Sequence, residues 1–307
     1  MVPVALEQQV IGVDVGGTKT LAAVVTRDGE LEACLDPPTD RSSQDALLAQ
    51  LDELVEHLRH EREVAALGFG LPSRIDQRSG RALASVNIPL EGVDFRERMR
   101  ERHGLPVGID NDANAAAIGE WQAGAARGAQ HVVMLTLGTG VGGGLILDGR
   151  PYRGATGSGA ELGHVVIAYD GPPCGCGGQG HLESFGAGPA ADAVAARLLG
   201  DGSKAPELVD RAQAGEREAV DALAEIGRRL GAGISSFVNV FEPELVVVGG
   251  GFGTAAGELL LGPAREVLAR EGLVPARDTV RVVGAELGGN AGVIGAGMIA
   301  FEALGQV

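Results

Sequence analysis

The sequence predicts an α/β protein with two domains of similar plan. Short apolar runs, typical of buried strands, alternate along the chain with longer stretches whose apolar residues recur at helical spacing. A pattern of strand, glycine- and threonine-rich turn, strand and Asp-Gly occurs twice, at residues 10–29 and 132–149. The chain has 307 residues, of which 45% are apolar, and is therefore long enough to fill two hydrophobic cores.

The turn of the first hairpin carries residue types that hold phosphate groups. It joins expected strands at residues 9–15 and 21–25 and reads D-V-G-G-T-K at residues 14–19. A carboxylate ends the strand, glycine amides can approach a phosphate closely, and a hydroxyl and a cation follow. The spacing fits neither the Rossmann nor the Walker pattern. A tight hairpin turn without a ligand is the alternative.

A helix is expected at residues 42–62, where leucines recur at helical spacing, with Ser42 and Asp45 as its N-terminal cap. Residues 64–71 then form a buried strand that ends at Pro72. A strand, a helix and a strand in succession predict that the two strands pair in parallel.

Polar side chains gather at the end of the next strand. This strand is expected at residues 107–109, and it delivers D-N-D to the start of an alanine-rich helix. Ligands bind at the carboxyl ends of strands in open α/β sheets, and a helix N-terminus favours the ionised form of Asp112. Alternatively, Asp110 or Asp112 only caps the helix. Residues 74–87 before the strand are expected to be loop, in which Asn87 is a ligand contact or, as the sequence favours, a turn residue.

The second half repeats the plan of the first, because the hairpin at 132–149 suggests a second domain that offers its own phosphate-holding loop to a cleft between the domains. The elements expected after it are helices at 186–200, 206–214 and 220–241, a strand at 244–248, a helix to residue 270, a strand at 280–283 and a helix at 291–304. The glycines at 249–251, between strand and helix, can cradle a nucleotide or can let helix and sheet pack closely.

The segment at residues 161–183 concentrates histidines and cysteines in a glycine- and proline-rich loop. Cys174 and Cys176, with His164 before them and His181 after, supply the four ligands of a closed tetrahedral zinc site. The C-x-C spacing is tighter than usual, so a glycine-rich surface loop with incidental thiols stays open as the alternative.

The composition limits the partners of the protein. Its formal charge of -16, from 41 acidic and 25 basic residues, argues against nucleic acid and a dedicated polyphosphate substrate. Lysine occurs only at Lys19 and Lys204, so the cation in the first turn stands out. Three cysteines fit a reducing compartment better than a disulfide framework. Residues 1–9 lack a secretory pattern and no apolar run approaches the ~18 residues of a membrane span, so the cytoplasm is expected.

Five motifs follow one another in a fixed order along nearly the whole chain. They are D-V-G-G-T-K at 14–19, N-D-A-N-A-A at 111–116, L-G-T-G-V-G-G-G at 137–144, E-L-G-H at 161–164 and C-G-C-G-G-Q-G-H-L-E at 174–183. Together they resemble the ROK family of repressors, open reading frames and kinases, and within it the bacterial glucokinases. The resemblance implies the actin-like, ribonuclease-H-like ATPase fold of two α/β domains, with sugar and ATP in the cleft. The expected small domain comprises residues 1–112 and about 291–307, and the large domain comprises 113–290.

The resemblance also implies roles for the residues that match the family's motifs. Asp112 looks like the catalytic base, which takes the proton from a sugar hydroxyl as it attacks the γ-phosphate of ATP. The implied sugar contacts are Asn87, Asn111, Asp112, Glu161, His164 and Glu183. Asp14 matches the carboxylate near Mg²⁺. The implied ATP contacts are Gly16, Gly17, Thr18 and Lys19, then Thr139, Gly140, Val141 and Gly142, and, beside the adenosine, Gly249, Gly250 and Gly251.

The metal loop departs from the family at one position. The family motif ends with a third cysteine two residues before the glutamate, and His181 occupies that place here. The expected site therefore has two thiolates and two imidazoles, Cys174, Cys176, His164 and His181, and one negative charge fewer. We expect a structural Zn²⁺, with loss of the metal as the alternative.

The implied activity is the ATP-dependent phosphorylation of glucose at its 6-hydroxyl. A kinase for N-acetylmannosamine, N-acetylglucosamine or fructose is the main alternative, because the pocket around the 2-position sets the choice of sugar. A sugar-responsive repressor is disfavoured, because the chain is acidic and offers no room for a DNA-binding domain ahead of Asp14. A non-catalytic sugar-binding protein would be expected to have lost Asp112 or the characteristic residues of the phosphate loops, and this sequence retains them. The resemblance implies a homodimer or homotetramer.

Overall fold

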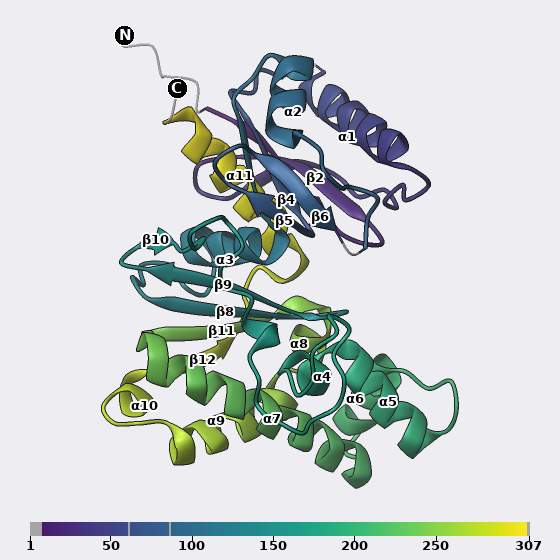
Figure 1. Ribbon diagram of the computed structural model, residues 1–307, viewed down its shortest axis with the longest axis vertical. Coiled ribbons are helices and arrows are strands. Elements are labelled where there is room, and N and C mark those ends of the chain that lie inside the picture. The colour runs from purple at the N-terminus through teal and green to yellow at the C-terminus, as the bar shows by residue number, and fades with distance from the viewer. Residues whose placement is uncertain (1–7, 61, 86, 306–307) are drawn as a thin grey trace. The chain divides into compact units, whose positions relative to one another are not determined.

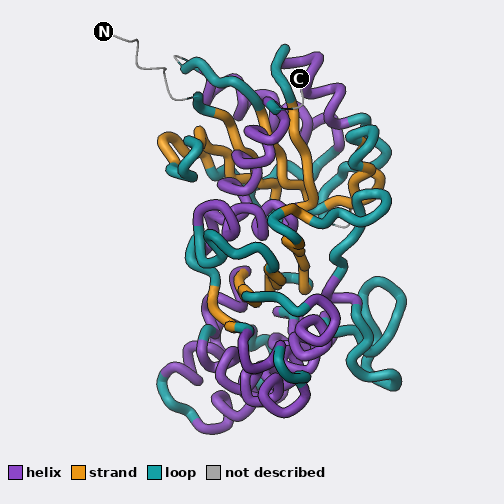
Figure 2. The backbone as a smooth tube through the Cα atoms, turned by 90° about the vertical axis from the view of Figure 1, so that its left-hand side faces the viewer, coloured by secondary structure: helices purple, strands orange, loops and turns teal. Residues whose placement is uncertain are grey.

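Two five-stranded mixed sheets, each with its own helices, make up the protein (Figures 1 and 2). The computed structural model describes residues 8–60, 62–85 and 87–305. Unit 1 comprises Met1–Arg127, Pro151–Ala160 and Asn290–Val307, and unit 2 comprises Gly128–Arg150 and Glu161–Gly289. The predicted α/β class and the presence of two units are confirmed, while the domain limits expected from the sequence stay a prediction.

Unit 1 is built on a sheet of strand order β3-β2-β1-β4-β7, with a separate two-stranded sheet, β5-β6. Its strands are β1 (Val10–Val15), β2 (Thr20–Val25), β3 (Leu31–Leu35), β4 (Leu67–Leu71), β5 (Ser73–Asp76), β6 (Arg81–Ser85) and β7 (Val107–Asn111). Its helices are α1 (Gln44–Arg59), α2 (Phe95–His103), α3 (Asp112–Ala123) and α11 (Ala291–Leu304). β1 and β2 form the predicted antiparallel hairpin, and β4 pairs in parallel with both β1 and β7.

Unit 2 repeats this plan with the order β10-β9-β8-β11-β12, in which the hairpin β8-β9 is again followed by two parallel strands, so the predicted internal repeat is confirmed. Its strands are β8 (Val132–Leu137), β9 (Val141–Leu147), β10 (Arg150–Pro151), β11 (Leu245–Gly249) and β12 (Arg281–Gly284). Its helices are η1 (Leu162–His164), α4 (Glu183–Gly186), α5 (Gly188–Leu199), α6 (Ala205–Gln213), α7 (Arg217–Phe241), α8 (Gly250–Ala256), α9 (Glu258–Glu271) and α10 (Ala276–Thr279). None of the helices described in either unit is long and apolar enough to cross a membrane.

The two faces of the unit 1 sheet are covered by different helices because side chains alternate along each strand. Val13 and Phe69 belong to the apolar cluster that also contains the buried leucines of α1. On the other face, Gly12, Gly68 and Gly108 lie in one register row across β1, β4 and β7, and a side chain on any of them would collide with the backbone of α11. This row of glycines lets α11 lie directly against the sheet.

Three local expectations are wrong. Ser43, not Ser42, caps α1, because the hydroxyl oxygen of Ser43 accepts a hydrogen bond from the backbone N–H of Ala46 at 3.1 Å. The expected loop at 74–87 contains the hairpin β5-β6. The single helix expected up to residue 270 is two helices, α8 and α9, separated at Gly257, whose φ of 49° lies in the left-handed region. Strand β3 and helix α2 were not expected at all.

Candidate functional site

The carboxyl ends of β1, β4 and β7 bring two carboxylates of unit 1 close together. Asp14 of β1 is in register with Gly70 of β4, and Gly70 is in register with Asp110 of β7. A Cβ on Gly70 would lie 3.5 Å from Oδ1 of Asp14 and 3.7 Å from the α-carbon of Asp112. Gly70 therefore leaves room between Asp14, near the end of strand β1, and Asp112, at the start of helix α3. This edge of the sheet is where ligands of α/β proteins bind.

Asp14 has a strongly perturbed acidity. Burial and the nearby charge of Asp112 raise the pKa of Asp14 from 3.8 to about 7, while Lys19 opposes the rise. The first turn of α11 presses on the carboxylate so closely that a side chain at Gly292 would collide with it. A divalent cation at this point would relieve the repulsion between the two carboxylates, and carboxylate oxygens are the donors that Mg²⁺ prefers. The donor set thus fits Mg²⁺.

Helix α3 is capped by Asn111, which leaves Asp112 as its first residue. Oδ1 of Asn111 accepts hydrogen bonds from the backbone N–H groups of Ala113, at 2.9 Å, and Asn114, at 3.3 Å. Oδ1 of Asp112 accepts from the same Ala113 N–H at 2.9 Å. The capping role that the sequence left open for Asp110 or Asp112 therefore belongs to Asn111. Asp112 lies at the positive end of the helix dipole.

A backbone hydrogen bond closes the first glycine-rich turn. The N–H of Gly16 donates to the carbonyl of Lys19 at 2.9 Å. Thr39 braces the turn from outside, because its hydroxyl donates to the carbonyl of Gly16 at 2.7 Å and its N–H donates to the carbonyl of Thr18 at 3.0 Å. The side chains of Thr18 and Lys19 are exposed. The turn thus presents a hydroxyl and a cation to solvent.

Asn87 lies beside this turn. A Cβ on Gly17 would be 3.1 Å from Cβ of Asn87, so the two residues pack against each other. The Nζ of Lys19 lies 3.8 Å from Oδ2 of Asp36, and both side chains are largely exposed, so this pair leaves the ammonium able to move. In unit 1 the structure therefore brings Asn87 to the first turn, and Asp14 to Asp112.

In unit 2, Glu183 connects the second glycine-rich turn to the cysteine–histidine loop. Its Oε2 accepts a hydrogen bond from the N–H of Val141 at 3.0 Å, and its Oε1 accepts from the thiol of Cys174 at 3.3 Å. A side chain at Gly140 would collide with the same carboxylate. The turn itself closes through the N–H of Gly138, which donates to the carbonyl of Gly140 at 2.9 Å. One carboxylate therefore contacts both predicted features.

Four side chains of the loop form a group suited to a metal ion, namely His164, Cys174, Cys176 and His181, whose ligand atoms all lie within 4.8 Å of one another. The Sγ of Cys174 is 3.8 Å from Nδ1 of His164, and the Sγ of Cys176 is 3.3 Å from Nδ1 of His181. A tetrahedral zinc site with Zn–S of ~2.3 Å and Zn–N of ~2.1 Å separates sulfur and nitrogen by about 3.6 Å. The observed separations bracket this value, so the donor set fits Zn²⁺.

The loop keeps these ligands together through short-range backbone contacts. His164 ends η1, and its N–H donates to the carbonyl of Glu161 at 3.1 Å. The N–H of Cys174 donates to the carbonyl of Gly178 at 2.8 Å, and Val166 forms a bridge with His181. The predicted sugar contacts of unit 2, Glu161, His164 and Glu183, therefore all flank one structured loop.

The glycines at 249–251 differ in their surroundings. Gly250 has φ 79°, and a side chain on it would meet the backbone of Leu137 at 2.5 Å, so close packing of α8 on β8 requires glycine there. A Cβ on Gly251 would meet no atom within 4 Å. Packing accounts for Gly250, while Gly251 borders open space that a ligand could use.

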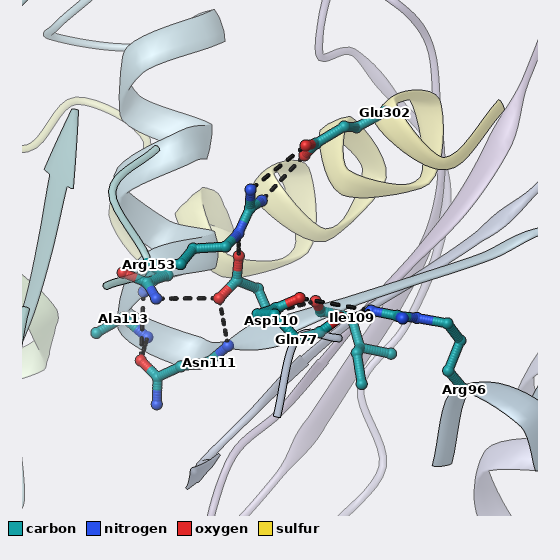
Figure 3. Close-up of polar contacts among 9 residues, drawn as sticks. Gln77, Arg96, Ile109, Asp110, Asn111, Ala113, Arg153 and Glu302 are labelled. Carbon is teal, nitrogen blue, oxygen red and sulfur yellow. Dashed lines mark hydrogen bonds and ion pairs between the residues drawn. The ribbon is translucent and has the colours of Figure 1, made fainter. Parts of the chain in front are cut away.

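The sequence did not reveal a network of charged side chains in unit 1, in which Arg153 contacts both Asp110 and Glu302. Figure 3 shows Arg153 between the carboxylates of Asp110 and Glu302, which come from β7 and α11. The sequence suggests only that Asp110 could cap the following helix. Arg153 lies 43 positions later, in a segment without helical or strand periodicity, so nothing in the sequence links the two residues. A charged residue in a glycine-rich stretch was the available signal, and it is too common to be informative.

Comparisons with known proteins give one family. The profile of the ROK family matches residues 10–303. A glucokinase of Streptomyces coelicolor is 36% identical over 311 residues, which cover 95% of this chain and 97% of the relative. The crystal structure of a ROK hexokinase from Thermus thermophilus has 35% identity and a TM-score of 0.86, and covers 98% of this chain and 100% of that one.

A second structure, of a ROK family glucokinase from Streptomyces griseus in complex with glucose and AMPPNP, has 35% identity and a TM-score of 0.84. The match covers 96% of this chain and 99% of that one. These likenesses confirm the implied fold of two α/β domains of the sugar-kinase type.

Proposed function

The chain belongs to the ROK family, and we propose that it is an ATP-dependent glucokinase that phosphorylates the 6-hydroxyl of glucose. The observation that carries the proposal is the position of Asp112, at the N-terminus of α3 beside Asp14, in a chain 36% identical to a glucokinase over 95% of its length. The glucose and AMPPNP in the complex from Streptomyces griseus support the same pair of substrates.

Asp112 is the proposed general base. The sugar hydroxyl oxygen attacks the γ-phosphorus, the bond to the bridging oxygen of ATP breaks, ADP leaves, and the hydroxyl proton passes to the carboxylate of Asp112. The helix N-terminus favours the ionised form of this carboxylate, which is the form that accepts the proton. A base of this type contributes roughly 10²- to 10⁴-fold in rate.

The proposed sugar contacts are Asn87 and Asn111 in unit 1 and Glu161, His164 and Glu183 in unit 2. Carboxylate, amide and imidazole groups suit sugar hydroxyls because each hydroxyl can donate and accept. For Asn111 the capping geometry decides which atom is available. Its Oδ1 already accepts two backbone N–H groups, so Nδ2, which lies 3.5 Å from the carbonyl of Ser73, is the atom that donates to a sugar oxygen.

Two glycine-rich turns are proposed to hold the phosphates of ATP. The turn at residues 16–19, together with Lys19, and the turn at residues 139–142 are proposed to contact phosphate through N–H groups other than those of Gly16 and Val141, which already donate to the carbonyl of Lys19 and to Glu183. Residues 249–251 are proposed to lie beside the adenosine, where Gly251 borders open space. Mg²⁺ near Asp14, when bound, neutralises charge that develops on the transferred phosphoryl group.

A structural Zn²⁺ is proposed for His164, Cys174, Cys176 and His181. Four protein ligands leave no open position, so the ion would shape the loop that bears the proposed sugar contacts. Elemental analysis of purified protein is expected to give about one zinc per chain, because a site closed by four protein ligands holds a single ion. His181→Cys, which restores the family's third thiolate, should keep the zinc, and His181→Ala should lose it. Well under one zinc per chain in the unmodified protein would refute the proposal.

The kinase proposal is tested by a coupled assay of ADP formation. Asp112→Asn is expected to reduce turnover of glucose by ~10²-fold or more. Asp45→Asn is the matched control, because Asp45 is likewise an acid in the first turn of a unit 1 helix but is exposed on α1, and it should retain full turnover. Near-normal turnover by Asp112→Asn would exclude its role as base.

The same assay decides between glucose and the other hexoses. Glucose is expected to give a higher kcat/KM than N-acetylmannosamine, N-acetylglucosamine or fructose. A preference for one of these three would make the protein a kinase of that sugar, and no turnover with any of them would favour a sugar-binding regulator. The proposed homodimer or homotetramer is tested separately by sedimentation velocity, and a monomer at micromolar concentration would contradict it.

A further inference from the structure

Unit 1 contains a buried carboxylate that the proposed reaction does not use. Asp110 is the penultimate residue of the parallel strand β7, two positions before the proposed base, and is 0% exposed. Its Oδ2 lies 2.5 Å from Nε of Arg153, and Nη2 of Arg153 lies 2.9 Å from Oε2 of Glu302 on α11. Figure 3 shows the guanidinium of Arg153 between the two carboxylates. A buried charge is tolerated only when it is paired in this way.

The second oxygen of Asp110 acts on the start of α3. Oδ1 accepts a hydrogen bond from the N–H of Asn111 at 2.8 Å and another from Nδ2 of Asn114 at 3.0 Å. One carboxylate oxygen therefore holds Arg153, and the other holds the residues on both sides of Asp112. Any rotation of the Asp110 carboxylate would release the cap residue and the first turn of the helix together.

The backbone around Arg153 is also held in place, so Arg153 cannot move together with the carboxylate of Asp110. Its carbonyl accepts a hydrogen bond from the N–H of Gly159 at 3.0 Å, which closes the segment at 151–160 into a loop. The carbonyl of Thr156 in this loop accepts from the N–H of Gln77 at 3.4 Å. The side chain of Gln77 in turn donates to the carbonyl of Ile109 in β7 at 3.1 Å, as Figure 3 shows. The loop that carries Arg153 is thus tied to the same strand that carries Asp110.

We propose that Arg153 is a positioning residue, which holds the carboxylate of Asp110 and thereby fixes Asp112 at the point where it takes the sugar proton. The inference rests on the proposed role of Asp112. Without Arg153, the buried Asp110 must take up a proton, turn toward water or admit water. A proton weakens the hydrogen bonds that Oδ1 accepts from Asn111 and Asn114, and a turn of the carboxylate breaks them. A displacement of ~1 Å at a reacting group can lower the rate by about 10²-fold.

A purely structural ion pair would affect folding and leave the turnover of folded enzyme unchanged. Unit 1 offers such a pair as a control, because Arg98 contacts Asp52 through Nη2 at 2.7 Å and Nη1 at 3.0 Å and joins α2 to α1. Asp52 is 7% exposed, so its charge is nearly as deeply buried as that of Asp110. Arg98→Met therefore removes one arm of a buried ion pair from the same unit, while Asp52 keeps its contacts with Nε2 of His103 at 3.1 Å and Nε of Arg102 at 3.6 Å.

The test compares Arg153→Met, Arg98→Met, Glu302→Gln and Asp112→Asn by kcat, by KM for ATP and by melting temperature. Arg153→Met is expected to lower kcat by ~10- to 100-fold with an unchanged KM for ATP. Arg98→Met should lower the melting temperature but keep kcat, and Glu302→Gln should keep kcat because the contact between Arg153 and Asp110 remains. Full kcat in Arg153→Met, or an equal loss of kcat in Arg98→Met, would overturn the proposal.

Two further outcomes are separated by design. If Asp112→Asn is inactive while Arg153→Met has full kcat, the positioning role fails and the proposed function stands; if Asp112→Asn is fully active, the proposed base is wrong and the positioning role falls with it. If Arg153→Met does not fold, Arg153→Lys replaces it, because it keeps the charge but not the planar fork of donors. Its kcat is expected to fall by ~3- to 10-fold at a melting temperature near that of the unmodified protein. Unchanged kcat in the lysine variant would overturn the proposal.

Discussion

Replacing Asp14 by Asn is expected to make unit 1 more stable at neutral and alkaline pH and to abolish kinase activity. The side chain of Asn has nearly the same shape but no charge to bury beside Asp112. Burial and the charge of Asp112 raise the pKa of Asp14 in the folded protein to about 7, so ionisation of Asp14 works against folding. The same carboxylate is the proposed partner of Mg²⁺, so its loss should remove activity while stability rises.

The expected change in the free energy of unfolding follows from the shift in the pKa of Asp14. The rise from 3.8 to about 7 corresponds to at most about 4 kcal/mol, at ~1.4 kcal/mol for each pH unit. Because the folded-state pKa is the higher one, the contribution to stability is fully present below pH ~4 and is lost as the pH rises through 7. About half of it is already lost at pH 5.5, so the stability of the variant relative to the unmodified protein should grow by roughly 2 kcal/mol between pH 5.5 and pH 8.

Urea unfolding followed by tryptophan fluorescence measures this difference in the free energy of unfolding, and it does so for unit 1, which contains Asp14. The chain has a single tryptophan, Trp121, and it lies in α3 of unit 1. Unfolding is measured at pH 5.5 and pH 8 without added Mg²⁺ or nucleotide, with Asp45→Asn as the control for loss of an exposed carboxylate. A stability difference between Asp14→Asn and the unmodified protein that stays constant with pH, or shrinks as the pH rises, would refute the reasoning.

Three other perturbations have defined outcomes. Gly68→Ala should destabilise unit 1 by ~1–3 kcal/mol or more, because its Cβ would collide with α11, while Gly262→Ala on α9, with no atom within 4 Å, should be neutral or slightly stabilising; urea unfolding of the two variants tests the glycine row. Ser43→Ala should lower stability by about 1 kcal/mol and Ser42→Ala by much less, and equal losses would contradict the cap at Ser43. Treatment with a zinc chelator should lower the melting temperature of unit 2 and zinc should restore it, and an unaffected melting curve would indicate that packing alone holds the loop.

Local chemistry in the sequence sufficed for the two hairpins with glycine-rich turns and for the loop that holds the cysteines and histidines. Both glycine-rich turns lie between strands that pair with near neighbours in the chain, so their apolar runs and turn residues determine them. The ligands of the metal group span only residues 164–181, and their residue types identify them without any knowledge of packing. Such features need few contacts between distant parts of the chain.

The rest depends on contacts that local patterns do not encode. The need for glycine in β1, β4 and β7 becomes clear only when the strand register aligns these glycines against α11. Helix α11 lies close to the C-terminal end of the chain, far from these strands in sequence. The hairpin β5-β6 was missed because its short strands lack a long apolar run. Arg153 contacts Asp110 and Glu302 only because the fold brings them to it from β7 and α11. The raised pKa of Asp14 likewise comes from burial in the fold and then from the charge of Asp112, a neighbour in space but not in sequence.

The central claim is that this chain transfers the γ-phosphate of ATP to the 6-hydroxyl of glucose. Phosphorus NMR of a mixture of purified protein, glucose and MgATP tests it directly. The expected result is the appearance of glucose 6-phosphate and ADP in equal amounts, and their formation by Asp112→Asn should be slower by ~10²-fold or more. ADP and free phosphate without a sugar phosphate, or a phosphate on another hydroxyl of glucose, would contradict the claim.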